Sequence, residues 1–220
     1  INKGLINKRR RIPTKKLHTK IIKVDEPGKH TQMDVKHLPH ILTNGLKSYV
    51  YNFVDHASRW QFKRAYESYS AYSTNLFMQE LLLTCPFKIL RLQTDNGVEF
   101  TNKYLSHIDH PKEHILDKIC NENNIAKKLI PVGEKELNGL VERSHRMDDE
   151  ELYFSIRPKT LKELNEHLEK HCKWVNGYRL RKPLGWITAN TYLKNWPQKI
   201  IDLNRETNAG TDNVNQKIAA

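Results

Sequence analysis

Long apolar runs, paired cysteines and acidic residues near the N-terminus are all scarce in this chain of 220 residues. Its longest apolar stretches, such as Leu81-Leu82-Leu83, are far shorter than the ~20 residues that a membrane-spanning helix needs. No apolar segment follows the basic N-terminus, so we expect no signal peptide in this stretch. The three cysteines, Cys85, Cys120 and Cys172, are odd in number and widely spaced, which argues against a disulfide framework. We therefore expect a soluble protein of a reducing compartment.

Basic residues are abundant, and many of them lie at the start of the chain. The sequence holds 37 Lys and Arg against 25 Asp and Glu, a formal net charge of +12 at pH 7. Residues 1–23 contain nine of the basic residues and no acidic one. This excess predicts a polyanionic partner, although a merely solvated tail is the alternative. The candidate phosphate contacts in this arm are Lys8, Arg9, Arg10, Arg11, Lys15 and Lys16.

Apolar spacing and turn signals divide the rest of the chain into short elements. Alternating β-branched and aromatic residues predict five strands, at residues 31–35, 49–54, 61–66, 89–92 and 126–130. Helical spacing predicts four helices, beginning at Ser73, near Pro111, near Leu140 and at Thr160. Three strands come first and helices alternate with the others, so we expect one α/β domain with a mixed sheet and helices packed on it.

Two of these helices carry specific expectations. Ser73 is a candidate N-cap for the first helix, and Thr160 with Glu163 forms a capping box for the last. The third helix is expected to bury one stripe of its surface and to leave Glu142 on another. The predicted buried stripe consists of Leu140, Val141, Met147, Leu152 and Phe154.

Two aspartates occupy positions where a carboxylate is costly. Asp34 lies in the middle of an apolar strand, and Asp95 ends another strand just before the turn Asn96-Gly97. A buried carboxylate has to be paired, protonated or bound to a metal ion. A salt bridge or an edge position would explain either residue alone. Two aspartates on neighbouring strands would instead form the oxygen-rich site that Mg²⁺ or Mn²⁺ prefers.

Three blocks of sequence resemble the DDE catalytic core shared by retroviral integrases and bacterial insertion-sequence transposases. The first block is Gln32-Met33-Asp34, the second is residues 94–100 and the third is residues 138–146. The resemblance extends from about His30 to about Leu193, and its three blocks follow one another in the family's order. It implies an RNase H-like fold and a transposase or integrase that cleaves DNA 3′ ends and transfers strands.

The resemblance also implies the site residues, the cofactor and the partners. It makes Asp34, Asp95 and Glu142 the catalytic and metal-binding triad, with two Mg²⁺ or Mn²⁺ ions. Double-stranded DNA is the implied partner, and joining two DNA ends implies a homodimer or a larger assembly. A bacterial cytoplasmic, nucleoid-associated location follows from the same resemblance. The third block adds three candidate DNA contacts: Arg143, His145 and Arg146.

The third carboxylate of the triad has competitors. The spacing between Asp95 and Glu142 exceeds that of retroviral integrases, and Glu134 and Glu136 lie nearer to the retroviral spacing. We prefer Glu142 because a helix holds a carboxylate more firmly than a polar loop does. Towards the C-terminus the usual proline of the family after Thr188 is Ala189.

The sequence also leaves several broader readings open. We expect a basic arm or linker over residues 1–27, a catalytic core over 28–158, a helical extension over 159–200 and a tail over 201–220. Because the chain begins with Ile1, we expect an upstream portion. A DNA-binding remnant without catalysis and a metal-dependent nuclease of the same fold are the alternative functions. A zinc site is disfavoured because its candidate ligands match no standard spacing; they are His107, His110, His114 and Cys120.

Overall fold

A five-stranded mixed sheet forms the centre of the computed structural model, which describes residues 24–103 and 113–197. The sheet order is β3-β2-β1-β4-β5. The strands are β1 (Thr31–Leu38), β2 (Ser48–Asp55), β3 (Gln61–Tyr66), β4 (Arg91–Thr94) and β5 (Ala126–Leu129). The first three strands pair antiparallel, whereas β4 runs parallel to both β1 and β5. The predicted mixed sheet with five strands is confirmed, with small shifts of the strand ends.

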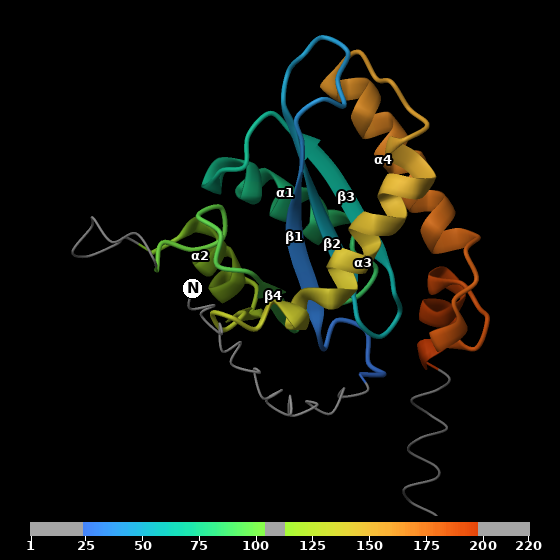
Figure 1. The fold of residues 1–220 in the computed structure, drawn as a ribbon. Coiled ribbons are helices and arrows are strands. Elements are labelled where there is room, and N and C mark those ends of the chain that lie inside the picture. The colour runs from blue at the N-terminus through green and yellow to red at the C-terminus, as the bar shows by residue number, and fades with distance from the viewer. Residues whose placement is uncertain (1–23, 104–112, 198–220) are drawn as a thin grey trace, which may run out of the picture.

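Helices cover both faces of this sheet (Figure 1). On one face, α1 and α2 pack over a core that includes Met33, Phe53 and Leu92. On the other face, residues of α4 and of the turn after α3 cover Val50 and Ala65, and α3 lies across β1 and β2. The α-helices on these faces are α1 (Ala71–Thr84), α2 (Ile115–Glu122), α3 (Gly139–Asp148) and α4 (Leu161–Gly177).

The helix ends agree only in part with the sequence-based expectations. Ser70, not Ser73, caps α1, because its hydroxyl accepts a hydrogen bond from the Ser73 backbone N–H at 3.2 Å. The start expected near Pro111 lies outside the described residues, and α2 begins after the cap residue His114. At α4 the predicted cap is confirmed, since the Thr160 hydroxyl accepts from the Glu163 N–H, but the Glu163 carboxylate accepts from the backbone N–H of Lys159 and not from that of Thr160.

The stripe predicted for the third helix is wrong at Phe154, which is 72% exposed. After α3 the backbone widens into a π-helical turn, η2 (Asp149–Tyr153), which shifts the phase of the side chains. Leu152 and Tyr153 therefore face the core. The buried residues of α3 itself are Val141, Ser144, His145 and Asp148.

Two short 3-10 helices complete the fold. The first, η1 (Lys135–Asn138), leads directly into α3, and the second, η3 (Lys182–Leu184), follows α4. Beyond η3 the chain is helical again from residue 189 to the end of the described part. Within the described residues, no helix has the length and apolar character needed to cross a membrane.

Candidate active site

Asp34 lies in β1, and Asp95 directly follows β4, the strand that runs parallel to β1. The register pairs Thr31 with Leu92 and Gln32 with Gln93. Continuing this register past the end of β4 would bring Asp34 beside Asp95, and the period of two would put both carboxylates on the face of the sheet that also carries α3. The expectation that neighbouring strands deliver the two aspartates therefore has a direct basis in the sheet topology.

Two buried glutamines attach the start of α3 to the same face. The side-chain amides of Gln32 and Gln93 both donate to the carbonyl oxygen of Leu137, at 2.5 and 2.9 Å. The Gln32 carbonyl oxygen in turn accepts from the backbone N–H of Val141 at 3.2 Å. These bonds fix the first turn of α3, which carries Glu142, over the strands of Asp34 and Asp95. Sequence reasoning missed this role of the two glutamines.

The residues of the third sequence block lie on different sides of α3. His145 is buried, and its Nε2 atom lies 3.3 Å from a carboxylate oxygen of Asp34. Its position therefore supports an interaction with the aspartate and not a contact to DNA at the surface. Glu142, Arg143 and Arg146 are exposed.

A fourth acidic residue, Glu99, belongs to the same neighbourhood and was missed in the sequence analysis. Its side chain is buried, at 7% exposure, and curls back over the turn that follows Asp95. Burial is the main cause that raises the pKa of Glu99, and repulsion from the Asp95 and Asp34 carboxylates raises it further. The only signal in the sequence was its position in the block Asp95-Asn96-Gly97-Val98-Glu99.

The donor chemistry of this neighbourhood fits a hard divalent cation. Asp34, Asp95 and Glu99 offer carboxylate oxygens, and the repulsion among them is the kind that a bound cation relieves. The side chains are not gathered into a ligand shell, because no three His, Cys, Asp or Glu residues of the described chain lie close enough to hold a metal ion. The fit therefore rests on the donor set and not on a preformed geometry.

Glu134 and Glu136 are exposed at the 3-10 turn before α3, and not in an irregular loop. His114 caps α2 through its ring nitrogen, and Cys120 is buried. The candidate contacts of the basic arm lie outside the described residues: Lys8, Arg9, Arg10, Arg11, Lys15 and Lys16.

The model of the integrase core domain matches residues 24–135, which is half of the chain. The chain belongs to the integrase core domain family. This match includes Asp34, Asp95 and Glu99 but ends before Glu142. The resemblance found in the sequence to integrases and transposases of the DDE type is thereby confirmed.

Relatives with known sequences or structures support the same family. The ORF3 protein of Spiroplasma virus SpV1-C74, a candidate integrase, is 27% identical over 170 residues, which is 74% of this chain and 46% of that protein. The chain thus spans about half the length of that relative. The catalytic core domain of BIV integrase matches with a TM-score of 0.55 and 22% identity, over 77% of this chain and 97% of the other.

Two further solved structures extend the comparison. The catalytic core of HTLV-2 integrase, solved in complex with magnesium in a trimeric form, has a TM-score of 0.55 and 20% identity over 76% of this chain and 96% of the other. A third structure is the intasome of simian T-cell lymphotropic virus in complex with PP2A regulatory subunit B56 gamma. It matches with a TM-score of 0.63 and 16% identity, over 78% of this chain and 56% of the other. These likenesses confirm the RNase H-like fold.

Proposed function

We propose that this integrase-family chain uses divalent metal to cleave DNA at a 3′ end and to transfer the freed strand to a second DNA. The proposal is supported by the parallel pairing of β1, which contains Asp34, with β4, which Asp95 directly follows, and by the hydrogen bonds that anchor the start of α3 to these strands. Water would break a phosphodiester bond and release a 3′-hydroxyl. That hydroxyl would then attack another phosphodiester, so one bond forms as one breaks and no further reactant is needed.

Each residue of the site has a distinct proposed part. Asp34 and Asp95 would hold the cations, two Mg²⁺ or Mn²⁺ ions per site, with Glu142 as the third ligand. Such ions supply charge stabilisation for an in-line displacement at phosphorus and make the attacking oxygen more nucleophilic. His145, at 3.3 Å, would orient the Asp34 carboxylate. The exposed Arg143 and Arg146 would contact DNA phosphates.

The partners follow from this chemistry. Double-stranded DNA would be bound largely through phosphates, with Lys8, Arg9, Arg10, Arg11, Lys15 and Lys16 of the basic arm adding contacts. Joining two DNA ends requires a dimer or a larger assembly of this chain. A nuclease that only hydrolyses DNA and a non-catalytic DNA-binding remnant are the competing functions, and the experiments below separate them.

Metal binding is tested first by thermal unfolding with Mn²⁺ and Mg²⁺. A cation at about 100 times its dissociation constant adds about 2.7 kcal/mol to the free energy of unfolding. For a chain of this size we expect the midpoint temperature to rise by about 5–10 °C. The rise should disappear in Asp95→Asn, weaken in Glu142→Gln and persist in Glu136→Gln, which is the matched control.

Other outcomes would change the assignment. A rise that is lost in Glu136→Gln and kept in Glu142→Gln would move the third ligand to the turn before α3. A rise that is lost in Glu99→Gln would add the buried glutamate to the ligands. No rise in the unaltered chain, even with duplex DNA present, would favour the remnant.

The reaction itself is tested on a duplex that carries a pre-cut 3′-hydroxyl end. Strand transfer should give products longer than the substrate, and Asp34→Asn should abolish them while the affinity for the duplex is largely kept. Shorter products alone would identify a nuclease and refute the transfer step.

A further inference from the structure

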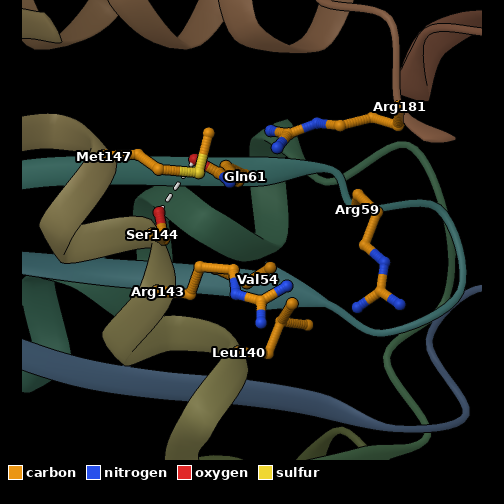
Figure 2. A pocket seen from close by; sticks show the side chains of 8 residues that line it. All are labelled: Val54, Arg59, Gln61, Leu140, Arg143, Ser144, Met147 and Arg181. Atoms are coloured by element: carbon orange, nitrogen blue, oxygen red, sulfur yellow. Dashed lines mark hydrogen bonds between the residues drawn. The ribbon is translucent and has the colours of Figure 1, made fainter. Parts of the chain in front are cut away.

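Three arginines from distant segments surround one small pocket on the α3 side of the sheet (Figure 2). Arg59 comes from the β2–β3 turn, Arg143 from α3 and Arg181 from the segment between α4 and η3. Val54 and Met147 form part of the apolar lining. The cavity volume is about 20 Å³, which is room for one water-sized group and not for a nucleotide base.

Two of the three guanidinium groups in this pocket, those of Arg59 and Arg181, have nitrogen atoms that lack hydrogen-bond partners within the described residues. Nε of Arg59, and Nε and Nη2 of Arg181, are buried without a hydrogen bond within the described part of the chain. A buried N–H group without an acceptor is costly, and a buried charge without a counter-charge is more so. These atoms therefore indicate a missing acceptor that carries negative charge.

The neighbouring carboxylates are each engaged elsewhere. Asp55 accepts hydrogen bonds from the backbone N–H groups of Gly28 and Ser58 and from the Ser58 hydroxyl. Glu151 pairs with Arg179 and His171, and Asp148 pairs with Lys63. None of these acids forms an ion pair with the pocket arginines among the interactions of the described residues. The pocket is thus positively charged and open to an external anion.

Repulsion among the arginines adds to the cost of burying them. Burial first, and then the charges of Arg179 and Arg59, outweigh the attraction of Glu151 and Asp148 and lower the pKa of Arg181 to about 10. Burial also lowers the pKa of Arg59; attraction to the Asp55 carboxylate opposes this lowering, and repulsion from Arg143 adds to it. Arg181 remains protonated at pH 7, so an anion that enters the pocket would relieve the repulsion.

The backbone holds two of the arginines in place. Arg59 adopts a left-handed φ of 64°, and the turn that contains it is fixed by the hydrogen bonds to the Asp55 carboxylate. Arg181 pairs with Ile187 across an isolated bridge, and the loop between them contains Trp186, also at a left-handed φ of 63°. Such costly conformations persist only where the surroundings determine them, and they are common at binding sites.

We propose that Arg59, Arg143 and Arg181 together bind one phosphate of the DNA backbone, beside the carboxylate site. Arginine suits this role because its planar fork matches phosphate oxygens in a bidentate manner. The small volume admits a phosphate oxygen and excludes a base, which favours a sequence-independent contact. The inference rests on the proposed function for its choice of DNA. Because Arg143 directly follows Glu142 on α3, this contact would position the strand relative to the carboxylates.

The pocket is tested in metal-free buffer, so the result does not depend on catalysis. Inorganic phosphate should raise the midpoint temperature of the unaltered chain above that in chloride of equal ionic strength, and Arg181→Gln should lose this effect. Arg181→Gln and Arg143→Gln should each weaken binding to a mixed-sequence duplex about tenfold or more, as expected for lost hydrogen bonds to a charged group. Lys170→Gln, an exposed charge on α4, should leave the affinity nearly unchanged.

A double-variant cycle distinguishes one shared phosphate from separate contacts. The Arg143→Gln/Arg181→Gln chain should bind the duplex more tightly than the product of the two single losses predicts, because both residues serve the same phosphate. Strictly multiplicative losses would overturn the shared site. Arg181→Lys keeps the charge but not the fork, so its affinity should fall between those of Arg181→Gln and the unaltered chain.

The remaining outcomes also decide the question. Stabilisation by inorganic phosphate with unchanged duplex affinity in the variants would overturn the DNA contact and leave a pocket for a free anion. No effect in either measurement would overturn the site as a whole. Failure of the metal and strand-transfer experiments, with the arginine effects intact, would instead refute the proposed catalysis and keep the pocket.

Discussion

The buried ion pair between Lys63 and Asp148 offers a demanding test of how α3 is held on the sheet. Lys63 points from β3, and its Nζ atom lies 2.6 Å from Oδ1 of Asp148, the last residue of α3. The two side chains are 0% and 3% exposed. The same ammonium donates to the side-chain carbonyl of Gln61 at 2.9 Å, and Nδ1 of His171 lies 3.8 Å from Asp148.

Replacing Lys63 by Met keeps most of the volume but leaves the Asp148 carboxylate buried without its counter-charge. Breaking a buried pair in this way costs about 3–5 kcal/mol. With a urea dependence of about 2 kcal/mol per molar, the unfolding midpoint should fall by about 1.5–2.5 M. Urea unfolding followed by circular dichroism measures this shift.

Two further variants make the reasoning refutable. The double variant Lys63→Met/Asp148→Leu should recover most of the lost free energy, because it removes both charges and leaves an apolar contact. The exposed pair Lys173–Glu169, 74% and 52% exposed, supplies the control, and Lys173→Met should cost less than about 1 kcal/mol. A Lys63→Met chain that loses under about 1 kcal/mol, or a double variant as unstable as the single one, would refute the argument.

Two other predictions concern stability. Burial is the main cause that lowers the pKa of His56 from 6.5 to about 3, and repulsion from His30 and Arg59 adds to it, so His56 is neutral in the folded chain. Its contribution to the free energy of unfolding is therefore full above pH 6.5 and is lost as the pH falls below that value, because the unfolded chain then binds the proton. At pH 5 this loss of unfolding free energy should reach about 2 kcal/mol. The His56→Leu variant should show a flatter dependence of the unfolding free energy on pH between pH 7 and 5 than the unaltered chain, and equal slopes in the two chains would contradict the argument. Gly28→Ala should cost more than about 2 kcal/mol, because Gly28 has a φ of +78° and a Cβ there would lie 1.9 Å from the Lys88 carbonyl oxygen. Gly45→Ala, at a φ of +77° with nothing within 4 Å, should cost only the backbone strain, and similar losses in both variants would refute the role of the clash.

The parts of the site that could be predicted are those with a local signal. Asp34 stood out because it interrupts an alternating strand, and Asp95 because it lies between a strand and an Asn-Gly turn. Both signals involve only the few residues around each aspartate. Family resemblance then added Glu142, whose place in the triad stays a prediction.

The parts that could not be predicted depend on residues far apart in the sequence. Gln32 and Gln93 are ordinary polar residues until the parallel pairing of their strands brings both amides to one carbonyl. The same holds for His145, which as a sequence motif suggested a DNA contact but is buried against Asp34. Phe154 was misplaced because nothing in the local pattern indicates the π-helical turn before it.

The sequence by itself determined the order and type of the strands and helices, the caps of α4 and the two aspartates, because periodicity, capping and turn chemistry act between residues near one another in the chain. The tertiary structure alone decided that the strand of Asp34 pairs parallel with the strand that leads to Asp95, that Glu99 lies within electrostatic reach of both aspartates and that three arginines line one pocket. Strand register and helix packing set these relations, and both depend on side chains from distant segments filling one core together.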